Sequence, residues 1–197
     1  MLLLVGLGNP GKEYAGNRHN IGFMAINEIV RHHSFSSSRT RSRPKGVFSE
    51  GMIEEVKVVT LKPLTYMNES GQVVGEALRY WNLESDQIFV IHDELDLAPG
   101  KVRAKLGGGD AGHNGLRSIT SHIGADYWRI RLGVGHPGEK ARVTGHVLHD
   151  FTKTDKVWVA RTVEAVAEAI SLLLTGDAAA FSTQVTLLTQ SHTPNRL

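Results

Sequence analysis

The sequence of 197 residues contains no cysteine and no long hydrophobic run. The absence of cysteine excludes disulfide bonds, a thiol nucleophile and thiolate metal ligands. The apolar start of the chain, residues 1–5, is shorter than a signal peptide or a membrane span requires. We therefore expect a cytoplasmic protein with no membrane segment, and the chain is long enough for a single domain with a sizeable core.

Several catalytic motifs are also absent from the sequence. It has no Gly-x-Ser-x-Gly elbow, which makes serine-esterase chemistry a poor candidate. It has no His-Glu-x-x-His pattern and no calcium loop. The segment His92–Asp96 and the pair His146 and His149 carry metal-ligating side chains at spacings that match no strong metal site. We expect no metal and no cofactor, with a metal bound at His92–Asp96 as the alternative.

The net charge of +2 conceals a concentrated basic region. Residues 101–142 carry eight Lys and Arg against three acidic residues, so the rest of the chain has a net charge of about −3. Five of these basic residues recur at every second position of two predicted strands: Lys101, Arg103, Lys105, Arg129 and Arg131. Such stripes beside the glycine-rich turn at residues 107–112 favour binding of a polyanion, and a solvated sheet edge is the alternative.

Apolar periodicity predicts an alternation of strands and helices. Strand patterns cover residues 2–7, 47–62 (two strands with a turn near 54–55), 88–92, 101–106 and 127–134. Helical patterns cover residues 21–30, 68–81, 114–122, 156–174 and a last helix that begins at an Asp177 cap and ends near 189. This order predicts an α/β fold with a single twisted mixed β-sheet flanked by helices, an α/β/α sandwich, in one domain spanning residues 1–197. The serine- and arginine-rich stretch at residues 34–46 is predicted to be a mobile basic loop.

Two residues suited to proton transfer lie at the predicted ends of elements. His19 precedes the first helix, and Asp93 follows the strand at residues 88–92. An imidazole oriented by a carboxylate can take a proton from water. The helix dipole would keep the His19 imidazole neutral and a neighbouring Asp93 would favour its protonation, so the sequence leaves open which effect dominates. A surface histidine without function is the alternative interpretation.

Three asparagines occupy similar positions at the ends of elements: Asn9, Asn68 and Asn114. Neutral amides can hold a substrate carbonyl group and the charge that develops on it during hydrolysis. Asparagine is also a common helix N-cap and turn residue, so each position has an ordinary structural explanation. Only their joint occurrence with His19 and Asp93 favours a hydrolytic site.

The segment Gly6–Gly11 matches the glycine pattern of a dinucleotide-binding loop. That motif requires a helix directly after the glycines and a strand ending in an acidic residue about 20 residues later. Here a turn follows the glycines, and the region near Glu28 has a helical pattern. We therefore interpret the segment as a tight loop that presents Asn9.

Seven segments carry a more specific pattern: Val5–Gly11, Arg18–Asn20, Lys62–Asn68, His92–Asp96, Gly107–Gly109, Gly112–Leu116 and Gly133–Gly138. Together, and in this order, they resemble the signatures of bacterial peptidyl-tRNA hydrolases. The resemblance covers nearly the whole chain. It implies a monomeric hydrolase without metal or cofactor, which cleaves the ester between a peptide and the 3′ ribose of tRNA. Its partner would be the acceptor end and 3′ CCA of peptidyl-tRNA.

The resemblance also implies roles for individual residues. His19 matches the catalytic base and Asp93 its orienting acid. Substrate-binding positions are matched by Asn9, Tyr14, Asn20, Tyr66, Met67, Asn68, His113 and Asn114. Lys105 and Arg131 match a clamp for phosphates of the tRNA end. Asp110-Ala111 departs from the common pattern, and an acid at this point would weaken nearby phosphate contacts.

Two functions of other classes stay open at this stage. One is an RNA-binding protein without activity, because a chloroplast intron-splicing protein resembles the same family. The other is a nucleotide-dependent oxidoreductase, suggested by Gly6–Gly11. The presence of both His19 and Asp93 favours the enzyme. Release of the acyl group from an N-blocked aminoacyl-tRNA would separate all three functions.

Overall fold

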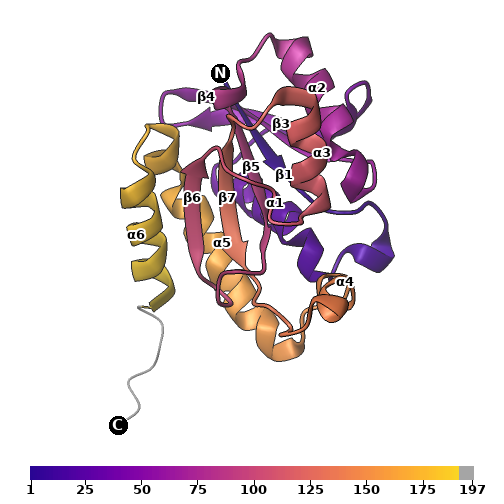
Figure 1. Cartoon of the computed structure of the whole chain (residues 1–197). Helices are drawn as coiled ribbons and strands as arrows, with labels where there is room; N and C mark the ends of the chain where they lie inside the picture. The colour runs from indigo at the N-terminus through magenta and orange to yellow at the C-terminus, as the bar shows by residue number, and fades with distance from the viewer. Residues whose placement is uncertain (191–197) are drawn as a thin grey trace.

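The computed structural model describes residues 1–190, whose strands form a single mixed sheet (Figure 1). Within these residues the sheet has seven strands, in the order β2-β3-β4-β1-β5-β7-β6. Their bounds are β1 Leu2–Gly6, β2 Arg39–Ser42, β3 Lys45–Ile53, β4 Val56–Pro63, β5 Ile88–Glu94, β6 Val102–Leu106 and β7 Trp128–Gly133. The four central strands β4, β1, β5 and β7 are parallel, and antiparallel strands complete both edges. The prediction of a single mixed sheet flanked by helices is confirmed.

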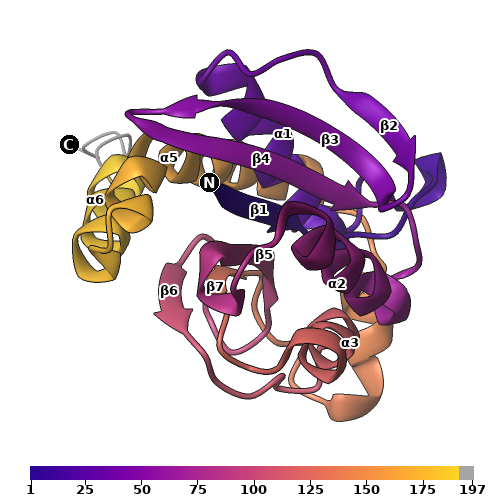
Figure 2. The same cartoon turned by 90° about the horizontal axis from the view of Figure 1, so that it is seen from above.

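Helices cover both faces of the sheet, as the view from above shows (Figure 2). Their bounds are α1 Ile21–His32, α2 Ser70–Trp81, α3 Asn114–Ile123, α4 Val143–Val147, α5 Lys153–Leu174 and α6 Ala178–Gln190. Short 3-10 helices are η1 Lys12–Tyr14, η2 Arg18–Asn20, η3 Met67–Glu69, η4 Ser85–Gln87 and η5 Lys140–Arg142. The layer of α1, α5 and α6 packs on one face and α2 and α3 pack on the other. No helix in the described residues is long and apolar enough to cross a membrane.

The central strands are buried on both faces, so the protein has two hydrophobic cores. Leu4 and Ile91 point toward α1 and α5, whereas Leu3 and Val90 point toward α2 and α3. Successive side chains of a strand alternate between faces, which explains why β1 and β5 are continuous apolar runs. Polar side chains are therefore found where these strands end. Ligands of open α/β sheets bind at these carboxyl ends.

The C-terminal helices begin at side-chain caps. At α5 the Thr152 hydroxyl accepts a hydrogen bond from Asp155 N at 3.1 Å, and the Asp155 carboxylate accepts one from Thr152 N at 3.0 Å. This reciprocal capping box starts the helix three residues before the apolar periodicity does. The Asp177 carboxylate accepts a hydrogen bond from Ala180 N at 2.8 Å, which confirms the predicted start of the last helix.

The prediction of a loop over residues 34–46 is wrong for residues 39–42 and 45–46, which are in strands. Residues 39–42 form the edge strand β2, which pairs with the start of β3. An edge strand exposed to solvent on both faces needs no apolar alternation, and arginine and serine suit such an edge. The Arg41 guanidinium lies over the rings of Phe48 and Trp81, 5.5 and 5.7 Å from their centres. Backbone pairing with β3 and these ring contacts stabilise residues 39–42 as a strand, although their composition is typical of loops.

Candidate active site

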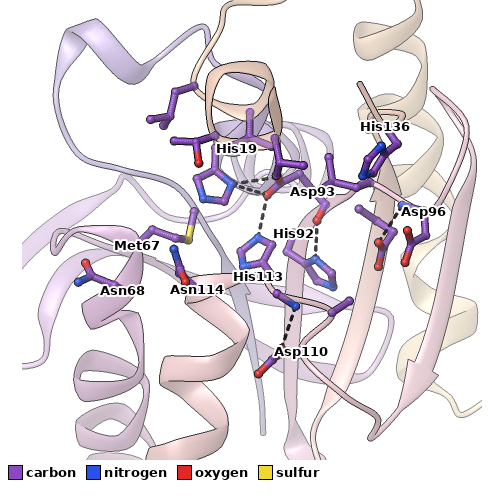
Figure 3. Close-up of a pocket in the computed structure, with 18 of the residues that line it drawn as sticks. His19, Met67, Asn68, His92, Asp93, Asp96, Asp110, His113, Asn114 and His136 are labelled. Carbon is purple, nitrogen blue, oxygen red and sulfur yellow. Dashed lines mark hydrogen bonds and ion pairs between the residues drawn. The ribbon is translucent and has the colours of Figure 1, made fainter. Parts of the chain in front are cut away.

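A cleft of about 740 Å³ opens at the carboxyl ends of the parallel strands (Figure 3). Eight of the predicted site residues line it: Asn9, His19, Tyr66, Met67, Asn68, Asp93, His113 and Asn114. They come from the segments after β1 and β4, from the end of β5 and from the start of α3, and they are far apart in the sequence. The structure therefore brings the predicted base, its predicted acid and the three predicted amides into one cleft.

Close packing of α1 against the sheet places His19 beside Asp93. A Cβ atom at Gly22 would lie 2.4 Å from Ile91 O and 2.5 Å from Leu7 N, so only glycine permits this approach of helix and strands. His19 sits in η2, immediately before α1. Its ring is thereby held against the end of β5, where Asp93 emerges.

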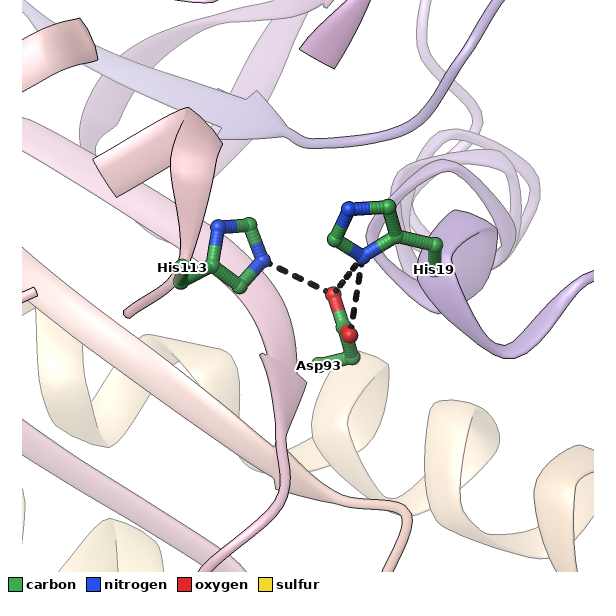
Figure 4. A group of neighbouring side chains, drawn as sticks. All are labelled: His19, Asp93 and His113. Carbon is green, nitrogen blue, oxygen red and sulfur yellow. Dashed lines mark hydrogen bonds and ion pairs between the residues drawn. The ribbon is translucent and has the colours of Figure 1, made fainter. Parts of the chain in front are cut away.

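His19, Asp93 and His113 form a hydrogen-bonded triad (Figure 4). The His19 Nδ1–H donates to Asp93, at 2.9 Å from each carboxylate oxygen. The His113 Nε2–H donates to Asp93 Oδ1, also at 2.9 Å. Asp93 is 3% exposed and His19 is 9% exposed. The carboxylate is therefore withdrawn from water and satisfied by two imidazoles, and only His19 was predicted to bind it.

The start of helix α3 fixes the proton on His113. Its Nδ1 accepts hydrogen bonds from Gly115 N at 3.1 Å and Leu116 N at 3.4 Å, which makes His113 the N-cap residue. Because Nδ1 is an acceptor, the single proton of the neutral ring lies on Nε2, which faces Asp93. The alternative interpretation of Asn114 as the N-cap of this helix is wrong, since Asn114 is its first residue. Its side chain lines the cleft.

The hydrogen bond to Asp93 leaves the opposite nitrogen of His19 as the basic one. With its proton on Nδ1, the neutral His19 ring carries an unprotonated Nε2. Burial lowers the pKa of His19, but the charge and hydrogen bond of Asp93 outweigh it, so the pKa is raised above its ordinary value. Burial would raise the pKa of Asp93, but the charges and hydrogen bonds of His19 and His113 hold that pKa well below its usual range. Asp93 therefore outweighs burial in setting the pKa of His19.

His92 adds an uncharged imidazole to the same cleft. Its Nδ1–H donates to the backbone oxygen of Asp93 at 2.8 Å. Burial, followed by the charge of His113, lowers the pKa of His92 to about 3. His92 therefore stays neutral at physiological pH and takes no part in charge balance.

The loop after β1 is held by reciprocal amide contacts. The Asn20 side chain accepts from Asn9 N at 3.0 Å and donates to Asn9 O at 2.9 Å. The Asn9 side-chain oxygen accepts from Met67 N at 2.8 Å, so its NH₂ group remains available to the cleft. Asn20 was predicted to bind substrate, but it does not line the cleft and both ends of its amide serve Asn9. It is a positioning residue for Asn9 and, through it, for Met67.

Tyr14, Lys105 and Arg131 lie outside the lining of the cleft. Tyr14 packs edge-on against Tyr66 with ring centres 6.4 Å apart, which places it beside the rim. The Nε–H of Arg131 donates to Glu94, a lining residue, at 2.9 Å. Lys105 is exposed on β6. Lys105 and Arg131 lie on the adjacent strands β6 and β7.

The basic stripes are on one face of β6 and β7, as alternation predicted. Arg103 pairs in register with Arg131, and Lys105 pairs with Arg129. Ile130 lies on the opposite face, in the core with α5. The expectation of a solvated stripe is wrong for Arg129, which is buried on the ring of Tyr127, 4.2 Å from its centre.

Sequence reasoning assigned no substrate-binding role to the far wall of the cleft, although part of it lies in the segments that carry the resemblance. This wall is lined by residues from the end of β5 and the turn after it, the loop before α3 and the segment around α4: Glu94, Leu95, Asp96, Ala111, Gly112, His136, Lys140, Val143, Thr144, Val147 and Leu148. These segments are irregular or short, so no periodicity marks them. Asp110, whose acid was expected to disturb phosphate contacts, also lines the cleft and pairs with Arg117 at 3.4 Å. The hydrogen bond from Gly112 N lowers the pKa of Asp110; burial opposes it, and the charges of Arg117 and Arg129 add to the lowering.

The triad also contains the residue types that bind metal ions, with ligand atoms of His19, Asp93 and His113 within 4.8 Å of one another. The nitrogen atoms that face the carboxylate are the ones that donate hydrogen bonds to it. A metal ion at this point would have to replace both hydrogen bonds and their protons. The arrangement therefore fits a proton-transfer site, and metal independence stays a prediction.

Comparison with known proteins gives one consistent family. The chain matches the peptidyl-tRNA hydrolase family over residues 3–193. It is 57% identical over 188 residues to the peptidyl-tRNA hydrolase of Parvibaculum lavamentivorans, covering 95% of this chain and 91% of the relative. Identity to the Acidiphilium cryptum enzyme is 57% over 191 residues, covering 96% and 98%. The crystal structure of peptidyl-tRNA hydrolase from Acinetobacter baumannii is similar, with a TM-score of 0.88, 39% identity and 94% of both chains covered.

Proposed function

Since the chain belongs to the peptidyl-tRNA hydrolase family, we propose that its cleft cleaves the ester between a peptide and the 3′ ribose of tRNA with water activated by His19. The protein is a hydrolase that acts on peptidyl-tRNA. The observation that carries the mechanism is the triad, in which Asp93 holds a buried His19 in the tautomer of a base. The mechanism uses this chain's own side chains for every proton transfer.

In the first step, His19 Nε2 accepts a proton from water as the water oxygen attacks the ester carbonyl carbon. The imidazolium that forms is stabilised by the ionised Asp93, whose pKa lies well below its usual range. In the second step, the tetrahedral intermediate collapses and its bond to the 3′ oxygen breaks. His19 returns the proton to that oxygen. The products are a free peptide carboxylate and tRNA with a 3′ hydroxyl.

Amide groups around the triad would hold the carbonyl oxygen as it becomes negative. The NH₂ of Asn9 remains available, and Asn68 and Asn114 line the same cleft. Within residues 1–190, the side chains of Asn68 and Asn114 have no hydrogen-bond partner, so both can bind substrate without breaking a protein contact. Donors that are already placed for the developing charge lower the barrier without reorganisation. Met67 and Tyr66 supply the apolar part of the groove for the peptide.

The tRNA end would leave the cleft over β6 and β7. Lys105 and Arg131 lie on adjacent strands, on the same face and offset by two residues in register, which suits two cations that bind neighbouring phosphates. The ion pair of Arg131 Nε with Glu94 holds its guanidinium beside the cleft while its terminal nitrogens remain free to donate. A substrate made during translation also favours a cytoplasmic location and a monomer that needs no protein partner.

Acyl release from N-blocked aminoacyl-tRNA in ¹⁸O-water tests this function. We expect the released acid to contain one ¹⁸O atom and the tRNA to keep an intact, rechargeable 3′ end. Binding of the substrate without acyl release would make the protein an RNA-binding module and overturn the proposal. Label in the ribose oxygen would show cleavage of a different bond.

A further inference from the structure

Arg129 is a buried cation without a hydrogen-bonded ion pair in the described residues, although its charge contributes to the lowered pKa of Asp110. The side chain is 2% exposed, and its Nε and Nη2 atoms have no hydrogen-bond partner. Its Nη1 makes a long contact of 3.5 Å with Ala125 O. Among residues 1–190, no carboxylate lies within 4.0 Å of the guanidinium. Stacking on Tyr127 is the main favourable contact, and it does not replace a counter-ion. A buried unpaired charge is costly, so its presence calls for an explanation.

A second cation faces Arg129 directly. Lys105 is its register partner across β6 and β7, and like charges in opposing positions of a sheet destabilise the pair. Both cations approach the same point of the main chain. A Cβ atom at Gly108 would lie 2.6 Å from Lys105 Nζ and 3.4 Å from Arg129 Nη1. The positive charges of Lys105 and Arg129 therefore lie near each other at Gly108, and a bound anion would offset their repulsion.

The backbone at this point is shaped like an anion-binding loop. Gly107 and Gly108 have φ angles of +72° and +109°, which residues with side chains rarely adopt. The Gly107 N–H donates to Tyr127 O at 2.9 Å. In the described part of the chain the N–H groups of Gly108 and Gly109 have no hydrogen-bond acceptor. Consecutive free N–H groups in a glycine loop form a concave site for phosphate oxygens.

We propose that Lys105, the Gly108 and Gly109 N–H groups and the buried Arg129 form one phosphate site for the tRNA backbone. Lys105 and the loop make the contacts, and Arg129 supplies a fixed positive charge beneath them. This inference rests on the proposed function, because it adds a third cation, Arg129, to the clamp of Lys105 and Arg131. Arg131 has its Nε paired with Glu94, whereas Nε of Arg129 has no hydrogen-bond partner. A charge held in a low-dielectric environment acts more strongly on a bound phosphate than a solvated one.

The proposal makes an unusual prediction about stability. Arg129→Met removes an unpaired buried charge and keeps most of the apolar stem. The variant should therefore melt at the same or a higher temperature than the wild type in chloride buffer. Inorganic phosphate at matched ionic strength should raise the melting temperature of the wild type and leave that of the variant unchanged. Arg103→Met, on the same face and exposed, is the matched control and should retain the phosphate effect.

Binding to whole tRNA gives the second readout. In Arg129→Met the slope of log affinity against log salt should fall by up to about 0.7–0.9, the value for one phosphate, because without the charge of Arg129 the contacts of Lys105 and the loop weaken. Hydrolysis of a minimal ester that carries only the terminal nucleoside should be unchanged. Arg129→Lys should restore part of the affinity, since it keeps the charge. A minimal ester that the wild type does not cleave would refute the proposed function and leave the phosphate measurements unaffected.

A titration of the unmodified protein decides the question even where a variant fails to fold. Inorganic phosphate at constant ionic strength should shift the amide resonances of Gly108 and Gly109 in a saturable manner. Gly145 and Gly176, in other loops and helices, should not move. The proposal is overturned if these loop amides show no saturable shift, or if Arg129→Met retains the full phosphate effect on melting. Equal losses by that variant on whole tRNA and on the minimal ester would also overturn it.

Discussion

Replacing Asp93 by asparagine should trap His19 in the wrong tautomer. An amide offers one acceptor oxygen and one donor NH₂ group in place of two acceptor oxygens. His113 cannot change its proton, because its Nδ1 accepts from Gly115 and Leu116 at the start of α3. The amide oxygen therefore binds His113, and the NH₂ group faces His19 Nδ1. His19 then carries its proton on Nε2 and loses the basic atom that faces the cleft.

The size of this effect follows from the buried geometry. Asp93 is 3% exposed, so water cannot substitute for the lost carboxylate. The same replacement in a Ser-His-Asp triad lowers kcat by about 10⁴ through the wrong tautomer. We expect kcat for Asp93→Asn to fall by about 10³–10⁴, or roughly 4–5.5 kcal/mol of transition-state stabilisation. KM should change little, because the cleft keeps its shape.

The pH dependence of kcat gives an independent test of the role of Asp93, because the direction in which the acid limb moves can be predicted. In the wild type Asp93 outweighs burial and raises the pKa of His19 above 6.5, so activity is lost as the pH falls through that raised value. In Asp93→Asn burial remains and now lowers the pKa, so the acid limb of the residual activity should move to lower pH. Asp96→Asn, at the rim of the cleft, is the control and should leave the limb in place. An unmoved acid limb in Asp93→Asn, or an unchanged kcat with a raised KM, would refute this account of Asp93.

Other predictions address the metal, the tRNA clamp and the fold. Activity should survive prolonged chelation, and a loss reversed by one specific divalent ion would favour the alternative of a metal bound at His92–Asp96. Lys105→Ala and Arg131→Ala should each raise KM for whole tRNA, lower the salt slope by about 0.7 and spare a minimal ester; equal losses on both substrates would contradict the clamp. Gly22→Ala should lower stability by about 1–3 kcal/mol and reduce kcat, because its Cβ meets backbone atoms at 2.4–2.6 Å. Gly145→Ala, with open space around its Cβ, is the control in a thermal melt, and equal melting temperatures would argue against close packing at Gly22.

The sequence predicts the architecture well where burial imposes a pattern. Continuous apolar runs marked β1 and β5, and the period of α5 was visible apart from its capped first turn. The edge strand β2 was missed because its pairing is made by the backbone, and its side chains are free to be polar. A composition typical of a loop therefore concealed a strand.

The identity of the main site residues could be predicted from the sequence, but the hydrogen bonds between them and their burial could not. Chemistry and position pointed to His19, Asp93 and the asparagines. The hydrogen bond of His113 to Asp93 depends on the position of the N-terminus of α3 relative to β5, which no local sequence pattern specifies. The burial of Arg129 depends in the same way on packing beside β7, since alternation gives the face of a side chain and not its depth. Asn20 was assigned to substrate binding because it is polar and lies near the predicted base. In the structure its side-chain amide instead hydrogen-bonds the backbone of Asn9.

The central claim is that His19 is the base that activates water, and a single-turnover measurement on His19→Ala tests it most directly. The rate of acyl release from N-blocked aminoacyl-tRNA is measured with all substrate bound, so binding does not enter the comparison. The account predicts a rate constant at least about 10²-fold below that of the wild type, with affinity for the tRNA within a few-fold. A rate constant close to that of the wild type would contradict it and remove His19 from the chemistry.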